Sequence, residues 1–199
     1  MRLVFTLVAL AILVFCGDAN AQQRTNEVAG SVGLGGTTQR DLGFVRLEDR
    51  TLPTYALTLR FAGRVANRPW GQLHLGGLIA GGAWQTETLR DTEQARRPLL
   101  DVGPFATWRG RMRPIAPVLG ASIGFSATAP SIPEIFQGVR FGVGLYTDLW
   151  VGGSWHRRRA LVGLELAWTH RRWVSNTPDV LITNHQAVYR LVVGWTGKD

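Results

Sequence analysis

The feature that most constrains this chain is an apolar pattern with a period of two near its end. The odd positions of residues 186–195 are all apolar or aromatic: Ala187, Tyr189, Leu191, Val193 and Trp195. On an extended strand, this alternation places the odd and even positions on opposite faces. A strand of about 9–11 residues with one continuous apolar face is the repeating unit of a transmembrane β-barrel.

Seven earlier segments repeat this pattern. The predicted strands are residues 27–36, 54–65, 71–84, 99–109, 115–126, 138–151, 160–173 and 186–195. They predict an all-β fold, a closed antiparallel eight-stranded transmembrane β-barrel, because an open sheet edge would leave unpaired backbone groups in hydrocarbon. The last strand should pair with the first near Val28 and Leu34. Pro104 lacks the N–H that a ladder uses, which predicts a bulge or a bend in the fourth strand.

The connections between these segments alternate in length. The long ones are polar, at residues 37–52, 85–97, 127–137 and 174–184, and the short ones lie at residues 66–69, 110–114 and 156–159. Outer-membrane barrels show this asymmetry, with short periplasmic turns and longer extracellular loops. An even number of strands also brings both ends of the barrel domain to the periplasmic side.

The first residues predict export. Arg2 precedes a short apolar run at residues 3–15, and Ala19-Asn20-Ala21 follows as a small-residue cleavage site. We therefore expect a cleaved signal peptide at residues 1–21 and one barrel domain at residues 22–199. A lipoprotein signal with a lipidated Cys16 fits less well, because Phe15 is bulky. Cys16 is the only cysteine, so the domain has no disulfide or thiolate metal site.

The strand parity places many charged side chains in the lumen. The predicted interior set is Arg60, Arg64, His74, Asp101, Arg109, Arg140, Asp148, Glu165, Arg171 and Arg190. Two interpretations remain open: a narrow, porin-like lumen that prefers anions because arginine is in excess, or an ion-pair network that fills the lumen. We favour the network, because eight strands enclose little more than side chains.

Tryptophans near the strand ends predict the aromatic girdles of a membrane protein. The predicted girdle residues are Trp70, Trp108, Trp155, Trp173 and Trp195. Tryptophan is enriched at membrane–water interfaces, where its ring lies at the level of the headgroups. Core tryptophans of a soluble sheet are the alternative interpretation.

The formal net charge of +8 comes almost wholly from arginine, with Lys198 as the only lysine. In a cytosolic protein such a charge would indicate nucleic acid, but an exported chain does not meet it. We expect as partners the outer-membrane lipid, lipopolysaccharide and the barrel insertion machinery, and the charged loops give no specific ligand.

The sequence predicts no catalytic residue, cofactor or metal. The four histidines, His74, His156, His170 and His185, are scattered, and their spacing predicts no pair on one face. The glycine pairs lie inside alternating segments, where glycine allows close packing.

Together, the eight segments, the loop alternation, the signal and the aromatic end of the last strand resemble the small outer-membrane barrels of the A/X type in Gram-negative bacteria. This resemblance implies an outer-membrane location and a structural or surface-binding role without catalysis, although architecture alone does not carry function. One difference is that residues 196–199 follow Trp195, where the family usually ends.

Two alternatives remain. His170 with Ser175 and Asn176 faintly resembles the lipid A deacylase barrels, which carry His-x-Ser-Asn and a following glutamate. Here His170 and Ser175 are five positions apart, which places them on opposite faces, and no glutamate follows Glu165. The other alternative is a soluble periplasmic lipocalin-like barrel, with the apolar parity facing inward.

Overall fold

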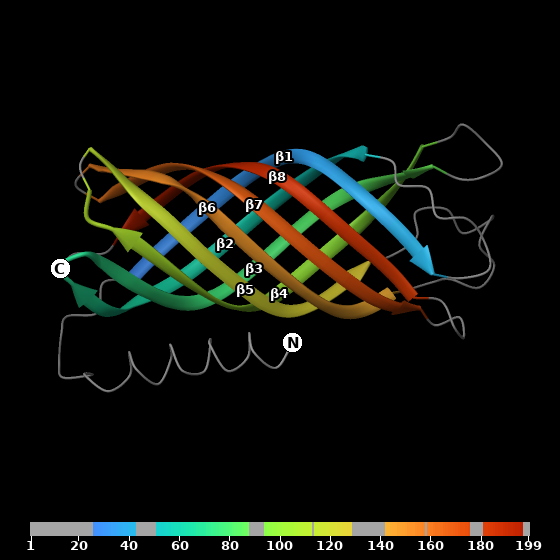
Figure 1. Ribbon diagram of the computed structural model, residues 1–199, viewed down its shortest axis with the longest axis horizontal. Helices are drawn as coiled ribbons and strands as arrows, with labels where there is room; N and C mark the ends of the chain where they lie inside the picture. The colour runs from blue at the N-terminus through green and yellow to red at the C-terminus, as the bar shows by residue number, and fades with distance from the viewer. Residues whose placement is uncertain are drawn as a thin grey trace.

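A computed structural model describes residues 26–42, 51–87, 94–112, 114–128, 142–157, 159–175 and 181–196. These residues form a closed barrel of eight antiparallel strands in chain order (Figure 1). The strands are β1 (Asn26–Leu42), β2 (Thr51–Arg68), β3 (Gly71–Glu87), β4 (Gln94–Gly110), β5 (Ile115–Thr128), β6 (Gly142–Arg157), β7 (Ala160–Ser175) and β8 (Leu181–Thr196). The predicted fold class is confirmed. The predicted signal peptide at residues 1–21 and Arg140 lie outside the described residues.

The two ends of the barrel differ in their connections. At one end, short connections join β2 to β3, β4 to β5 and β6 to β7, and β1 begins and β8 ends there (Figure 1). We call this the turn end, and we call the opposite end the loop end. Among the described residues, no helix is long and apolar enough to cross a membrane.

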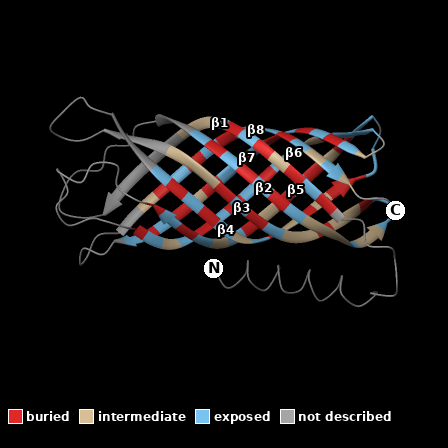
Figure 2. Ribbon diagram, turned by 180° about the vertical axis from the view of Figure 1, so that it is seen from behind, coloured by how far each residue is buried: buried red, intermediate tan, exposed pale blue. Residues whose placement is uncertain are grey.

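The apolar parity of the strands faces outward. Leu57 and Leu164 are 63% and 67% exposed, whereas Ala167 and Val188 are fully buried. Buried and exposed residues alternate along the strands all round the barrel (Figure 2). A soluble lipocalin-like barrel would have the opposite arrangement, so that alternative is wrong. The exposed apolar side chains form a lipid-facing belt.

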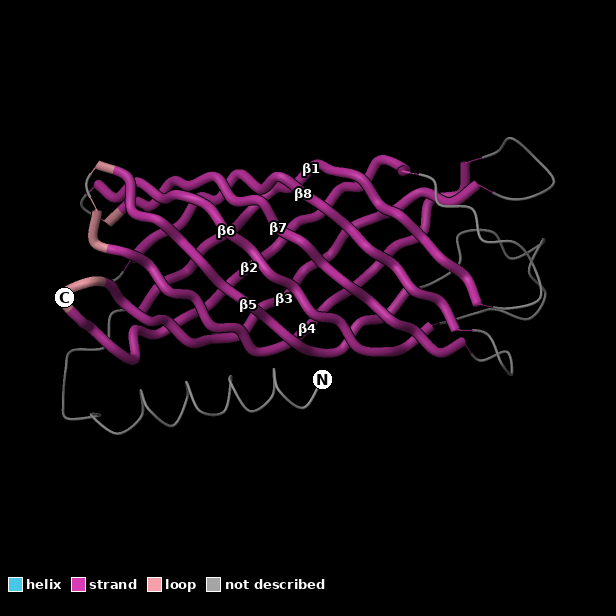
Figure 3. The backbone as a smooth tube through the Cα atoms, in the orientation of Figure 1, coloured by secondary structure: helices cyan, strands magenta, loops and turns pink. Residues whose placement is uncertain are grey.

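The barrel closes between its first and last strands. Val28 pairs with Trp195 and Leu34 with Tyr189, as the sequence predicted. The strands are staggered as well as closed. Successive partners run from Gly30 through Leu59, Ile79, Val102, Phe125, Leu145, Arg172 and Thr183 to Arg40, ten residues further along β1. This stagger accompanies the strong tilt of the strands (Figure 3) and leaves an interior that side chains just fill.

Several strands are longer than the alternation predicted. β1 continues to Leu42, β4 begins at Gln94 and β8 begins at Leu181, all within stretches that the sequence assigned to polar loops. The hydrophobic pattern reports only where one face meets lipid. Beyond the bilayer both faces of a strand meet water, so hydrogen-bonded pairing continues without an apolar signal.

Pro104 does not produce the predicted bulge. The pairing of β4 with β3 keeps one register through Pro104, and its pairing with β5 only skips Gly103 and Pro104 before resuming in the same register. The missing N–H of proline therefore interrupts one ladder without adding a residue. A register shift lies instead in β2, between Arg64 and Ala66.

Candidate functional site

The lumen is crossed by four ion pairs between strands that are not neighbours. From the turn end to the loop end they are Glu27–Arg109, Arg60–Glu165, Asp148–Arg190 and Asp101–Arg171. They join β1 to β4, β2 to β7, β6 to β8 and β4 to β7. All eight side chains are at least about nine-tenths buried. The inward-facing side chains thus connect non-neighbouring strands of the barrel wall through ion pairs.

The pair nearest the turn end is Glu27 with Arg109. Arg109 donates from Nη1 to Oε2 of Glu27 at 2.7 Å and from Nη2 to Oε1 at 3.0 Å. His74 lies beside them, with Nδ1 3.8 Å from Oε2 of Glu27. Glu27 was missing from the predicted interior set, although it shares its parity with Ala29 and Ser31. Its parity was the signal that could have identified it as an interior residue.

The second pair closes the middle of the lumen together with an indole ring. Arg60 donates from Nη1 and Nη2 to the two carboxylate oxygens of Glu165, at 2.9 and 2.8 Å. The guanidinium of Arg60 lies 4.2 Å from the ring centroid of Trp150, in cation–π contact. Gly120 makes room for this ring, because a Cβ there would lie 2.2 Å from the indole. Phe105 packs against Trp150 at a centroid distance of 6.1 Å.

The two pairs toward the loop end form a denser network. Asp148 accepts from Nη1 of Arg190 and from the hydroxyl of Thr169, both at 2.7 Å. Asp101 accepts from Arg171, at 2.9 Å from Nε and 2.6 Å from Nη2.

Arg171 is bonded at every nitrogen. Its Nη1 donates to Oε1 of Gln186 at 2.7 Å and to Oδ1 of Asn184 at 3.2 Å. All three nitrogens of this guanidinium therefore lie within one network that spans β4, β7 and β8.

Among the buried described residues, the four arginines and the four carboxylates balance in charge. Each of the four arginines above faces one carboxylate, so the arginine excess that favoured an anion-preferring pore does not line the described lumen. Arg64 is half-buried near the turn end, and Arg140 lies outside the described residues. Paired charges in a narrow interior satisfy one another.

A small polar cavity separates the Glu27–Arg109 and Arg60–Glu165 pairs. Its lining includes His74, Thr107 and Ser154, and its volume is about 10 Å³. Both ring nitrogens of His74 and the hydroxyl of Thr107 have no hydrogen-bond partner among the described residues. The cavity is therefore polar and has room for about one water molecule.

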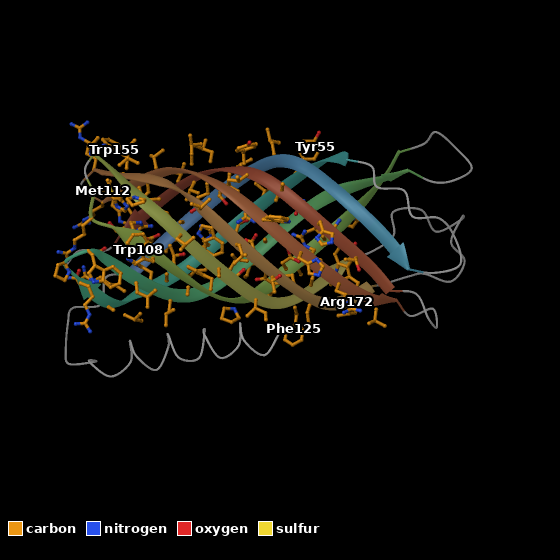
Figure 4. The ribbon with its side chains drawn as sticks, viewed as in Figure 1. Tyr55, Trp108, Met112, Phe125, Trp155 and Arg172 are labelled. Atoms are coloured by element: carbon orange, nitrogen blue, oxygen red, sulfur yellow. The ribbon has the colours of Figure 1, made fainter. Side chains whose placement is uncertain are left out.

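The predicted girdle tryptophans divide into two groups. Trp70, Trp155 and Trp195 are exposed on the outer surface near the turn end, and Trp108 is partly exposed beside Trp70, with their ring centroids 6.0 Å apart. Figure 4 shows Trp108 and Trp155 at this end. The sequence did not select the outward aromatics nearer the loop end: Tyr55, Phe125, Trp168 and Tyr189.

The prediction for Trp173 is wrong. Its side chain is 0% exposed and lies inside the barrel, where Nε1 donates to Oγ of Ser126 at 2.9 Å. Trp173 is two residues from Arg171 and therefore faces inward with it. The position of Trp173 near a strand end suggested a place at the membrane interface. The face of the strand from which its side chain projects places it inside the barrel instead.

The histidines also differ from the prediction, because two of them meet. His170 on β7 pairs with His185 on β8 on the outer surface, with their Nδ1 atoms 3.2 Å apart and their ring centroids at 4.5 Å. Strand register brings them together across the sheet, which spacing within one strand does not reveal. Two imidazoles are fewer than the three protein ligands of a catalytic zinc site, and the described residues hold no larger metal-binding group.

The described residues also contain a serine–histidine contact on β6. Oγ of Ser154 lies 3.2 Å from Nε2 of His156. No side chain in the described part of the chain forms a hydrogen bond with the other ring nitrogen, and Ser154 is buried. The contact has a nucleophile and a base without the third group that orients a catalytic histidine. His170 contacts His185, and Asn176 and the side chain of Ser175 lie outside the described residues.

A closed eight-stranded barrel with an apolar outer belt, girdle aromatics and a polar core defines the class of the small outer-membrane β-barrels. The fold and this belt place the protein in the outer membrane. In such barrels the short turns usually lie on the periplasmic side.

Solved structures show the same fold. Neisserial surface protein A (NspA) has a TM-score of 0.51 at 11% identity, covering 85% of this chain and 99% of its own. The outer membrane enzyme PagL has a TM-score of 0.52 at 15% identity, with 81% and 97% covered. OprG from Pseudomonas aeruginosa has a TM-score of 0.50 at 12% identity, with 88% and 96% covered. No protein-family model and no curated protein sequence matches the chain.

Proposed function

We propose that the protein is a closed outer-membrane barrel that conducts no solutes and has a structural or surface-binding role. The four ion pairs that cross the lumen support this proposal most strongly. A hydrated ion would have to separate several of these pairs in turn, and each separation leaves a buried charge without its partner. Breaking one buried pair costs about 3–5 kcal/mol.

The packing in the middle of the lumen adds a second barrier. Trp150 is 1% exposed, and it lies between the guanidinium of Arg60 and the ring of Phe105. These side chains occupy the middle of the lumen, which a channel would need to keep open. The scaffold is therefore rigid inside, and we expect binding to reside in the connections at the loop end, where rigid barrels usually carry it.

We also propose that the protein is not an enzyme. The serine of the Ser154–His156 contact is buried, and His170 contacts His185 on the outer surface. Neither histidine has the hydrogen-bonded neighbours of a nucleophilic site among the described residues. Outer-membrane lipid and lipopolysaccharide are the partners that this proposal implies, together with the insertion machinery during assembly.

Solute uptake tests the proposal. Vesicles that contain the refolded barrel should swell in an isotonic sugar solution no faster than protein-free vesicles. A variant with Trp150→Ala and Phe105→Ala removes two large rings and keeps the ion pairs. Its swelling rate shows whether the aromatic packing or the ion pairs form the main barrier to solutes. Swelling by the unchanged protein would contradict the proposal. For catalysis, an altered lipid A mass spectrum in cells that express the protein would contradict it.

A further inference from the structure

The turn end of the barrel carries a ring of tryptophan and arginine side chains. We call this ring the turn-end rim and define it as Trp70, Trp108, Arg111, Trp155, Arg157, Arg159 and Trp195. Trp70, Trp155 and Trp195 are exposed on the outer surface, as are Arg111 and Arg157. The rim is separate from the lumen, because the arginines that cross the lumen are paired inside it.

Two of the three short turns, β4–β5 and β6–β7, contribute both kinds of side chain to the rim, and the β2–β3 turn contributes Trp70. On β6, Trp155 and Arg157 are two residues apart and both exposed, so they lie on the same lipid-facing side, with the arginine nearer the end. At the β4–β5 turn, Arg111 follows Gly110, the last residue of β4. The ring centroid of Trp108, near the end of β4, lies 6.0 Å from that of Trp70 at the β2–β3 turn. Arg159 adjoins Trp195, because its carbonyl accepts from the N–H of Thr196 at 2.8 Å.

Among the described residues, the rim arginines have no acidic side chain as an ion-pair partner. In the described part of the chain, no carboxylate forms an ion pair with Arg111, Arg157 or Arg159. Arg111 donates to Oδ1 of Asn67, a neutral amide. The described acidic residue of this end, Glu27, is buried and bonded to Arg109. The sequence places Arg113 and Arg158 in the same two turns.

We propose that the turn-end rim binds the phosphate groups of anionic phospholipids in the periplasmic leaflet. Outward tryptophans place the end of the barrel at headgroup depth. Arginines two or three positions beyond them, Arg157 after Trp155 and Arg111 after Trp108, then reach the level of the phosphates, where a guanidinium can donate two parallel hydrogen bonds. The surface charge of an anionic leaflet attracts such basic groups.

The orientation of the rim favours lipid over an acidic protein. Arg157 shares the lipid-facing side of β6 with Trp155, so it extends along the barrel wall rather than across the mouth. A protein that docked at the periplasmic mouth would meet the ends of the turns, whereas a lipid meets the outer wall. The inference goes beyond the non-conducting role proposed above and does not depend on it.

Lipid selectivity measured with spin-labelled lipids tests the proposal. The refolded full-length domain is placed in phosphatidylcholine vesicles with a trace of spin-labelled phosphatidylglycerol or phosphatidylcholine. The fraction of label immobilised at the protein gives the relative association of the two lipids. We expect phosphatidylglycerol to associate at least about two-fold more strongly at low salt, and the preference to weaken at high salt.

Three variants locate the site. The triple change Arg111→Gln, Arg157→Gln and Arg159→Gln should remove most of the preference, and the matching triple change to lysine should keep part of it. Arg172→Gln, at an exposed arginine on the outer wall toward the loop end, should leave it unchanged. A heat-dependent gel shift checks that each variant folds. Equal association of both lipids with the unchanged protein would overturn the proposal, as would a preference that survives the triple glutamine change.

Discussion

The ion pairs nearest the two ends of the lumen use the same residue types but differ in how completely the arginine is bonded. Toward the loop end, Arg171 is bonded at all of its nitrogens, by Asp101, Asn184 and Gln186. Toward the turn end, Arg109 is bonded to Glu27 but its Nε has no partner among the described residues, and His74 has none at either ring nitrogen.

The cavity in the lumen also lies toward the turn end. The cavity borders the Glu27–Arg109 and Arg60–Glu165 pairs, and neither Asp101 nor Arg171 lines it. The Asp101–Arg171 pair holds its charges by direct bonds at every guanidinium nitrogen, whereas the Glu27–Arg109 pair leaves polar atoms beside space for water. Single nitrogens of Arg190, Asn184 and Gln186 also have no partner among the described residues, so the contrast concerns these two pairs. The loop-end pair should therefore be more sensitive to the loss of one partner than the turn-end pair.

The largest effect is expected for Asp101→Ala. This change leaves the guanidinium of Arg171 buried without a counter-charge, which should lower the free energy of unfolding by about 3–5 kcal/mol. Denaturant unfolding of the refolded barrel in detergent micelles measures it. The double variant Asp101→Ala with Arg171→Met should recover much of the loss, and a loss below about 1 kcal/mol in the single variant would contradict the account.

Trp173→Ala should come next. It removes a fully buried ring and its hydrogen bond to Ser126, and we expect a loss of about 3 kcal/mol. Trp155→Ala, at the exposed turn-end rim, is the matched control, because that ring faces lipid. The same unfolding assay compares them, and an equal loss in both would mean that Trp173 is not a core residue.

A smaller effect is expected for Glu27→Gln. The amide keeps the shape of the carboxylate and one acceptor, and the adjoining cavity lets water approach Arg109. The expected loss is about 2 kcal/mol, near that of one charge-assisted hydrogen bond. Asp101→Asn is the matching change at the loop end and should cost more. A larger loss of unfolding free energy in Glu27→Gln than in Asp101→Asn would contradict the proposed difference between the two ion pairs.

The smallest effect is expected at the histidine pair. His185→Ala removes an exposed contact with His170, and surface changes of this kind usually stay within about 0.5 kcal/mol. The mature domain should also bind zinc no more tightly than this variant does. A large stability loss, or zinc affinity that depends on His185, would show that the pair does more than the structure indicates.

Alternation along single strands was enough to predict which side chains face lipid and which face the lumen. It placed Arg60, Asp101, Glu165 and Arg171 on the inner face, where the structure has them. The prediction for Trp173 failed because this residue was assigned by its closeness to a strand end and not by the alternation. Glu27 was overlooked at the first inward position of β1.

The partners within the lumen could not be predicted. Arg60 and Glu165 are 105 residues apart, and Arg109 and Glu27 are 82 apart, so only the closed, staggered barrel brings them together. The same limit applies to His170 and His185, which meet through the register of β7 and β8. The cavity beside His74 likewise depends on how large side chains such as Trp150 and Phe105 divide the interior.

Electrical conductance across a planar bilayer tests the closed lumen most directly. The refolded protein should insert without producing discrete current steps in concentrated potassium chloride. A variant with Arg60→Ser, Glu165→Ser and Trp150→Ala removes the pair and the ring that close the middle of the lumen, and it should produce small steps if it folds to the same heat-modifiable form. Steady, reproducible channels from the unchanged protein would contradict the account.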